Sequence, residues 1–141
     1  MPSRFGVIGL GRMAQALVLP MLQSGLLQRE QLIAAVASER SAHELSASLA
    51  CMVSTDAAAC LQADELLLAL KPQQLDGLIS QIGGAAAIGA AAERAGPPPL
   101  LISVLAGVSL QRLQRSFPGW HVVRTVPNTP CLLYTSDAAD E

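Results

Sequence analysis

The sequence has few charged and few aromatic residues. Charged side chains make up 14% and aromatic side chains 3% of the 141 residues, whereas hydrophobic residues reach 51%. This composition excludes an intrinsically disordered chain, and it suits a parallel sheet that is buried between helices. The length corresponds to about one domain.

The sequence also lacks a strong net charge and long apolar runs. The formal net charge is −2, so there is no basic surface of the kind that nucleic acid requires. No apolar run approaches the roughly 20 residues of a membrane-spanning helix. Gly9, Gly11 and Arg12 interrupt the apolar segment that a secretion signal would need. We therefore expect a cytoplasmic protein that binds neither nucleic acid nor membrane.

Cysteine and histidine are too few and too scattered to predict a metal site. Cys51, Cys60 and Cys131 show no C-x-x-C spacing, and His43 and His121 form no H-E-x-x-H pattern. An odd number of cysteines also gives no support to a disulfide framework. We expect buried free thiols and no bound metal.

Short apolar runs alternate with helix-length segments along the chain. The expected strands are residues 4–8, 32–37, 52–54, 66–70, 100–104 and 121–126. The expected helices are residues 11–25, 41–49, 57–62, 73–82 and 109–117. This alternation predicts an α/β fold of the Rossmann-like, doubly wound kind, with a mostly parallel sheet and helices on both faces.

Polar residues and glycine indicate where several helices begin and end. Ser24 and Gly25 are expected to close the first helix. Ser41, with Glu44 three residues later, is expected to cap the second helix, and Ser109 the last one.

Proline marks two irregular places. Pro20 falls inside the first expected helix and predicts a kink or a lost hydrogen bond. Residues 83–99 are rich in alanine and glycine and end in three prolines. We interpret them as a crossover connection with a weak surface helix, and not as a domain boundary.

The most informative motif follows the first expected strand. Gly9, Gly11 and Ala14 have the spacing G-x-G-x-x-A, between a strand and a helix. In a dinucleotide-binding turn, the first glycine allows the tight turn, the second lets a pyrophosphate approach, and the third position must be small. The amides and the dipole of the following helix then favour the phosphates. The alternative is an ordinary tight turn.

The end of the second strand bears on which cofactor binds. An NAD site usually has an acidic residue there, which binds the 2′-hydroxyl group of the ribose. Ser38 occupies this position, and Arg40 could pair with a 2′-phosphate, which favours NADPH. Glu39 could become the ribose partner after a modest change of register, so NADH remains an alternative. Arg40 could also be a solvated surface residue.

Three later strand ends should meet at the same edge of the sheet, where the ligand crevice of an open α/β sheet lies. Lys71, Asn128 and the backbone around Ala106 are therefore candidate contacts on the nicotinamide side. Each has a simpler interpretation: a surface lysine before Pro72, a loop that leads into a helix, or a rigid proline-rich turn.

Together these motifs resemble the N-terminal domain of the pyrroline-5-carboxylate reductases. The resemblance covers residues 4–130 through G-x-G-x-M, A-x-K-P-Q, I-S-x-x-A-G-V-S and V-V-R-x-x-P-N-T-P. Many dehydrogenases share the first motif, whereas the last three in this order are specific. The resemblance implies NADPH-dependent reduction of a small-molecule substrate, 1-pyrroline-5-carboxylate, to L-proline. A weaker alternative is a dehydrogenase of the β-hydroxyacid or prephenate type, which would share only the opening turn.

The resemblance also implies which residues bind the cofactor. They would contact the pyrophosphate, the adenosine 2′-phosphate and the nicotinamide ribose in turn. The implied residues are Ile8, Gly9, Leu10, Gly11, Arg12, Met13, Ala14, Ser38, Arg40, Asp56, Ala69, Lys71, Pro72, Val104, Leu105, Ala106 and Asn128. An imine is already electrophilic, so placement of the nicotinamide supplies much of the catalysis and no catalytic residue is assigned.

Three positions and one segment depart from the family pattern. Pro20 interrupts the first helix, and the segment at residues 83–99 is longer than expected of the family. Arg12 replaces the amide residue that is common after the second glycine, and Asp56 stands where asparagine is frequent. A carboxylate at that place would repel a 2′-phosphate unless Arg40 compensates for it.

Residues 131–141 do not resemble the family. Cys131 to Ser136 resemble the translation of a transposon-end adapter used to prepare sequencing libraries. We therefore expect a non-native tail, which does not enter the fold. We also expect that the family's helical second domain, through which the full-length protein would form a homo-oligomer, is missing. The isolated chain would then bind NAD(P) without turnover.

Overall fold

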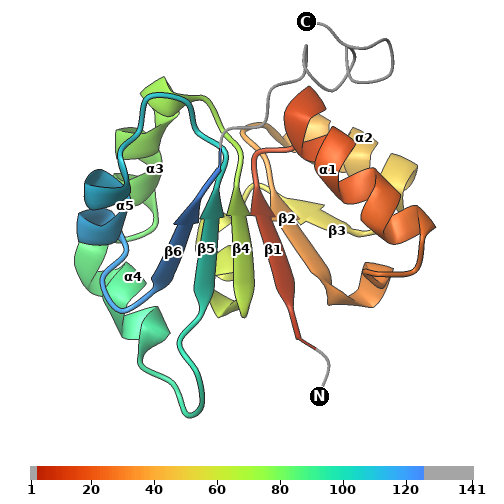
Figure 1. Cartoon of the computed structure of the whole chain (residues 1–141). Coiled ribbons are helices and arrows are strands. Elements are labelled where there is room, and N and C mark those ends of the chain that lie inside the picture. Colours follow the sequence, from red (N-terminus) through yellow and green to blue (C-terminus); the bar gives the residue numbers. More distant parts are fainter. Residues whose placement is uncertain (1–2, 126–141) are drawn as a thin grey trace, which may run out of the picture.

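Six strands form one parallel sheet in the computed structural model, which describes residues 3–125 (Figure 1). The strands are β1 (Phe5–Ile8), β2 (Leu32–Ala35), β3 (Met52–Ser54), β4 (Glu65–Leu68), β5 (Leu100–Ser103) and β6 (His121–Arg124). Their order is β3-β2-β1-β4-β5-β6, and each of these pairings is parallel. The order reverses between β1 and β4, as in doubly wound dinucleotide-binding sheets. The predicted fold class is confirmed.

Helices cover both faces of this sheet. The α-helices within the described residues are α1 (Arg12–Gln23), α2 (Glu39–Leu49), α3 (Leu75–Gln81), α4 (Gly84–Ala92) and α5 (Leu110–Ser116). Short 3₁₀ helices lie at η1 (Arg29–Gln31), η2 (Ala57–Gln62) and η3 (Pro72–Gln74). Helices α1 and α2 pack on one face, and η2, α3, α4 and α5 pack on the other (Figure 1).

Side chains of the strands alternate between the two helical layers. Phe5 and Val7 of β1 belong to the core beneath α1 and α2, where they join Val18. Ile8 belongs to the core on the opposite face, together with Leu78 of α3. Both faces are buried, so the inner strands are continuous apolar runs. This explains why the sequence has so little charge.

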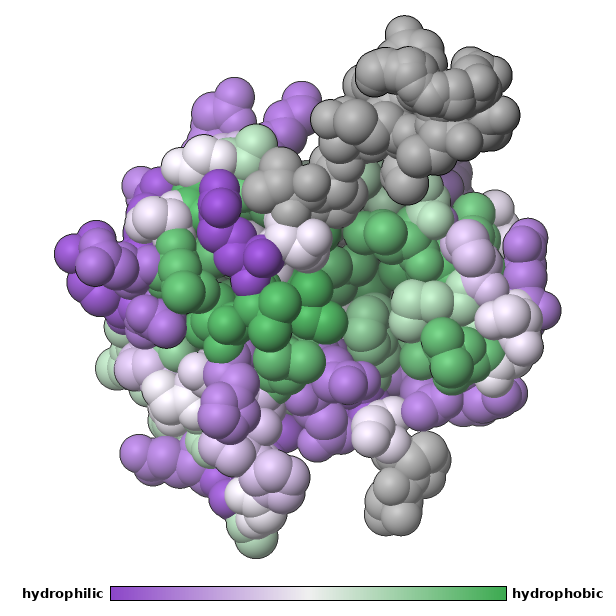
Figure 2. All heavy atoms as spheres, viewed as in Figure 1, coloured by the Kyte–Doolittle hydropathy of each residue, from purple (hydrophilic) through white to green (hydrophobic). Residues whose placement is uncertain are grey.

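Part of the sheet remains uncovered on the α1 side. Val123 of β6 is 49% exposed, whereas Val122, which points to the other face, packs against the core. Figure 2 shows apolar surface over this part of the sheet, between the two groups of helices.

The alanine-rich segment between β4 and β5 does form a helix, α4, as predicted. Ile88 is fully buried, and its carbonyl oxygen accepts a hydrogen bond from Nε1 of Trp120 at 2.9 Å. Trp120 in turn meets Phe117 edge to face, with ring centroids 5.7 Å apart. One buried side chain and one indole N–H therefore hold α4 against the core.

The second helix begins earlier than predicted. It runs from Glu39, and its N-cap is Ser38, whose Oγ accepts a hydrogen bond from the N–H of Ser41 at 3.1 Å. The prediction that Ser41 and Glu44 cap this helix was wrong, because Ser38 already has the extended backbone that an N-cap needs. The cap at Ser109 is confirmed, since its Oγ accepts an N–H from the first turn of α5 at 3.1 Å.

Helix α1 continues through Pro20 without a break. The carbonyl of Pro20 accepts from the N–H of Ser24 at 3.0 Å, and Gly25, with φ +81°, follows the end of the helix. Proline has no N–H, so the helix loses one hydrogen bond at Pro20, which lies on its exposed side. The predicted loss of a hydrogen bond is correct, and the predicted end at Ser24 and Gly25 is confirmed.

Other boundaries differ from the predictions by a few residues. Strand β2 ends two residues before the predicted residue 37. Strand β4 begins one residue before the predicted residue 66 and ends two residues before the predicted residue 70. The predicted helix at residues 57–62 is a 3₁₀ helix. Within residues 3–125 no single helix is long and apolar enough to cross a membrane, although the bent pair Pro72–Gln81 and Gly84–Ala92 reaches that length together.

Cys60 lies in the core between the sheet and η2. Its side chain is fully buried, and its Sγ lies 3.8 Å from the carbonyl oxygens of Val7 and Ile33. Burial raises the pKa of the Cys60 thiol to about 12, and the charge of Asp56 acts in the same direction. The thiol is therefore neutral in the folded protein under ordinary conditions.

We expect Cys60 to make folding less favourable as the pH rises. In the unfolded chain the thiol ionises near its ordinary pKa of 9.0, whereas in the folded protein it stays protonated up to about 12. The buried Cys60 thiol therefore contributes fully to the free energy of unfolding below pH 9. Between pH 9 and pH 12 this free energy falls by up to about 1.4 kcal/mol per pH unit.

Urea unfolding of the wild type and of Cys60→Ala, at about pH 8 and about pH 10.5, measures this loss. The variant should lose about 1–2 kcal/mol at the lower pH through the small cavity, and this deficit should shrink at the higher pH. A deficit that does not change with pH would contradict the burial of a neutral thiol.

Arg94 ties the end of α4 to the segment before β4. Its guanidinium group donates to the carbonyl oxygens of Ala91, Leu61 and Ala63 and to the carboxylate of Asp64, at distances of 2.9 to 3.3 Å. Arginine can satisfy several acceptors at once because its planar group carries five N–H donors.

Replacement of Arg94 should therefore destabilise the fold. We expect Arg94→Met to lower the free energy of unfolding by about 2–3 kcal/mol, since buried carbonyl groups lose a charged donor. Arg115→Met on the exposed side of α5 is the matched control and should cost less than about 0.5 kcal/mol. Equal effects of the two substitutions in urea unfolding would show that the contacts of Arg94 contribute nothing.

Candidate functional site

The ends of three strands meet at Gly9. The N–H of Gly9 donates to the carbonyl of Ala35 at the end of β2 at 2.8 Å. The carbonyl of Ile8 accepts from the N–H of Ala69, just after β4, at 2.9 Å. The strand order reverses at this point, so the loops that follow β1 and β4 run to opposite sides and leave a crevice between them.

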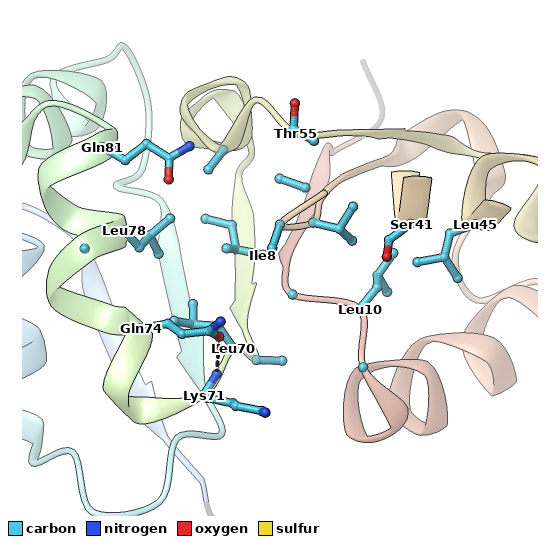
Figure 3. A pocket seen from close by; sticks show the side chains of 18 residues that line it. Ile8, Leu10, Ser41, Leu45, Thr55, Leu70, Lys71, Gln74, Leu78 and Gln81 are labelled. Atoms are coloured by element: carbon cyan, nitrogen blue, oxygen red, sulfur yellow. Dashed lines mark hydrogen bonds between the residues drawn. The ribbon is translucent and has the colours of Figure 1, made fainter. Parts of the chain in front are cut away.

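A cavity of about 810 Å³ opens at this edge of the sheet (Figure 3). This volume lies in the range of small-molecule sites. The lining residues come from the ends of β1, β2, β3 and β4 and from α2, η2, η3 and α3. They are Ile8, Gly9, Leu10, Gly11, Ala35, Val36, Ala37, Ser41, Leu45, Thr55, Ala57, Ala69, Leu70, Lys71, Gln74, Gly77, Leu78 and Gln81.

The two glycines of the turn are required for different reasons. Gly9 has a φ of +90°, and a Cβ there would lie 2.9 Å from the backbone of Ala69 and Leu70, so the fold itself requires glycine. Gly11 has a φ of −77°, and a Cβ there would meet open space. Packing within the protein therefore does not explain Gly11. An open position before a helix N-terminus is what the approach of a pyrophosphate requires, so the turn fits a dinucleotide.

The start of α1 is held firmly beside this opening. Ala14 is fully buried in the core beneath α1, so the small third residue of the motif serves the packing of the helix on the sheet. Nε2 of Gln15 donates to the carbonyl of Leu10 at 2.8 Å and fixes the loop that leads into the helix. Arg12 is exposed in the first turn.

Side chains at the start of α2 are engaged with one another. Ser38 caps the helix, and the Arg40 side chain, 89% exposed, lies 3.5 Å from the carboxylate of Glu44. The Glu39 carboxylate turns towards β3, where it accepts a hydrogen bond from Oγ1 of Thr55 at 2.7 Å. Arg40, which was predicted to bind the 2′-phosphate, thus pairs with Glu44. Glu39 is bonded to Thr55 in the cavity wall.

The adjacent wall combines a helix residue with the end of β3. Ser41 and Thr55 both line the cavity, and Figure 3 shows their side chains on the side that α2 and β3 contribute. Asp56 follows Thr55 and is exposed, with its N–H donating to Oγ of Ser54 at 3.1 Å.

The opposite wall is formed by the segment after β4 and by α3. The N–H of Lys71 donates to Oε1 of Gln74 at 3.0 Å, and the Lys71 side chain extends away from Gln74 (Figure 3). Pro72 begins η3. Further along α3, Leu78 and Gln81 line the cavity, and the amide of Gln81 faces it (Figure 3).

The loop after β5 lies outside this cavity. Leu105 is buried and its N–H donates to Oγ of Ser103 at 3.2 Å, while Val104 is half-buried and Ala106 is exposed. Nε of Arg124 donates to the carbonyl of Val108 at 2.7 Å and links this loop to β6.

The structure thus gathers only some of the predicted cofactor residues around one cavity. Those that line it are Ile8, Gly9, Leu10, Gly11, Ala69 and Lys71. Those that do not line it are Arg12, Met13, Ala14, Ser38, Arg40, Asp56, Pro72, Val104, Leu105 and Ala106. Asn128 and the tail at residues 131–141 lie outside the described residues.

Sequence reasoning missed several lining residues. Val36 and Ala37 could have been found, since they follow β2 at the predicted ligand edge. Leu78 and Gln81 carry only a weak signal, which is their i, i+3 spacing on the helix after β4. Thr55 gave no signal, because only the fold brings it to the cavity. In the part of the chain that the structure describes, no three His, Cys, Asp or Glu side chains are grouped as a metal site would require.

The strand order and the switch-point cavity define a Rossmann-type α/β domain. The model of the family described as "NADP oxidoreductase coenzyme F420-dependent" matches residues 4–107. The chain belongs to this family.

Two similar proteins are pyrroline-5-carboxylate reductases. The chain is 35% identical over 131 residues to a pyrroline-5-carboxylate reductase of Synechocystis sp., covering 92% of this chain and 45% of the relative. It is 33% identical over 128 residues to a pyrroline-5-carboxylate reductase of Methanosarcina acetivorans, covering 89% and 44%. The chain therefore spans about half the length of the curated relatives it matches.

Solved structures agree on the fold. A pyrroline-5-carboxylate reductase from Coxiella burnetii superposes with a TM-score of 0.75 at 22% identity, over 94% of this chain and 46% of that one. A Plasmodium falciparum pyrroline carboxylate reductase with NADP bound gives a TM-score of 0.67 at 21% identity, over 93% and 44%.

The two glycines of the turn should respond differently to the same substitution. Gly9→Ala should lower the free energy of unfolding by about 2–4 kcal/mol, because of its positive φ and its contact with the backbone after β4. Gly11→Ala should cost less than about 1 kcal/mol, since alanine is only a poorer N-cap there. Thermal or urea unfolding of the two variants measures the difference, and similar losses would argue against the distinction.

Proposed function

We propose that the protein is an NADPH-dependent oxidoreductase that reduces 1-pyrroline-5-carboxylate to L-proline. The observation that carries the proposal is the open position at Gly11, at the N-terminus of α1 and at the mouth of a switch-point cavity. The family supports a nicotinamide cofactor. The shared name of the relatives, which align with about nine-tenths of this chain, supports the substrate.

The described part of the chain would bind and orient the cofactor. NADPH, when bound, supplies the hydride for the imine carbon. The backbone at the N-terminus of α1 and the dipole of this helix would hold its pyrophosphate beside Gly9 and Gly11. The edge after β4 and β5, with Lys71 and Ala106, would border the nicotinamide. Placement of hydride and imine carbon at near-attack distance would provide much of the rate.

Ser38 and Arg40 would bind the 2′-phosphate in this proposal, with Asp56 close by. Arg40 must then leave Glu44, with which it pairs at 3.5 Å on the surface. Exposed i, i+4 pairs contribute only about 0.3–0.5 kcal/mol, so the exchange costs little. NADH is the second cofactor that the site could accept.

A second candidate function is dinucleotide binding without turnover by this chain alone. It is favoured by one observation, which is that the relatives are more than twice as long as the part that the chain matches. The substrate pocket and the homo-oligomer of the whole protein would then depend on the part that the longer relatives have in addition.

Titration of the chain with NADPH and NADH, followed by an assay of 1-pyrroline-5-carboxylate reduction, separates these proposals. We expect binding of NADPH, seen as a change in nicotinamide fluorescence or as heat. Turnover would support the reductase for this chain, and binding without turnover would support the binding function. Failure of both dinucleotides to bind would overturn both.

A matched pair of variants tests the place of binding. Gly11→Val fills the open position before α1, so it should weaken NADPH binding at least about tenfold, or about 1.4 kcal/mol. Gln23→Ala, at the exposed far end of the same helix, should leave binding unchanged. Equal affinities for the two variants would show that the dinucleotide does not approach the start of α1.

A further inference from the structure

The start of α2, where the proposed function places the 2′-phosphate, already carries the carboxylate of Glu39. Glu39 is the first residue of α2, where the helix dipole favours negative charge. Its carboxylate is fixed by Thr55, whose Oγ1 donates to it at 2.7 Å. Thr55 lines the cavity and Glu39 does not, so this carboxylate lies one hydrogen bond outside the cavity wall. We call this part of the wall the rim, and the proposed function places the 2′-phosphate there.

The other charges at this rim do not favour a phosphate strongly. Three carboxylates and one guanidinium group lie in the first two turns of α2 or just after β3. They belong to Glu39, Glu44, Asp56 and Arg40. The one cation already pairs with Glu44 at 3.5 Å. A phosphate monoester carries about −1.5 to −2 charges at neutral pH, so these carboxylates oppose its binding, whereas they do not oppose a neutral ribose hydroxyl.

We infer that Glu39, held in place by Thr55, determines cofactor selectivity and keeps the site open to NADH beside NADPH. This inference rests on the proposed function. The carboxylate competes with a 2′-phosphate for the N-terminus of α2 and can accept a hydrogen bond from a free 2′-hydroxyl. Glu39 is thus a specificity residue, and Thr55 is a positioning residue that acts through it.

Two changes of Glu39 and its hydrogen-bond partner test the inference. Glu39→Gln removes the charge and keeps the size, so it should raise the ratio of NADPH affinity to NADH affinity by about three- to tenfold. Thr55→Val removes only the hydrogen bond and should raise the ratio less, by about twofold. Thr55→Ser keeps a hydroxyl donor, so its ratio should lie closer to the wild-type value than that of Thr55→Val.

Binding is measured by calorimetry with NADPH, NADH, adenosine 2′,5′-bisphosphate and 5′-AMP, so the readout does not depend on turnover. Glu93→Gln at the exposed end of α4 removes an equal charge far from the rim and should leave the ratio unchanged. Circular dichroism verifies that each variant is folded.

The outcomes separate the two proposals. If the wild-type chain binds neither dinucleotide, the proposed function fails and this inference fails with it. If both bind and Glu39→Gln leaves the ratio within about twofold of the wild type, or lowers it, only the selectivity inference is overturned. A rise that Glu93→Gln reproduces would also overturn it, because net charge alone would then explain the effect.

Discussion

The backbone of Gly9 is the point on which the candidate site depends. Its N–H is bound to the end of β2, and the preceding carbonyl is bound to the residue after β4. A Cβ at this position would overlap the backbone of Ala69 and Leu70. The close approach of three strand ends therefore needs a residue without a side chain and with a positive φ. Because the loops diverge from this point, the cavity and its two walls follow from it.

The apolar core is what holds these strand ends in place. Residues of β1 alternate between the two helical layers, with Val7 fully buried on one side and Ile8 nearly so on the other. Such a sheet leaves little room for charge in the interior. Arg94 donates hydrogen bonds to the carbonyl oxygens of Leu61 and Ala63, where α4 meets the segment before β4. Low charge and a switch-point cavity are thus two consequences of one architecture.

The sequence predicted those features that depend on local pattern. The alternation of apolar runs and helical segments predicts the strand and helix order, and the spacing of Gly9, Gly11 and Ala14 predicts the turn. It did not predict that Ser38 caps α2, because several serines lie within reach of the helix start. Nor did it predict the bond between Glu39 and Thr55, since these residues are 16 positions apart and only the pairing of β2 with β3 brings them together.

This division has a physical origin. The pyrophosphate end of the candidate site is formed by backbone groups, so small residues at fixed spacing are enough to predict it. The ribose end is formed by long side chains with several available partners. Arg40 pairs with Glu44 because α2 places these two residues one turn apart. Family resemblance therefore transfers well to the first end. At the ribose end, a single carboxylate such as that of Glu39 alters the affinity for a 2′-phosphate. The residue at this position therefore has to be identified in each chain.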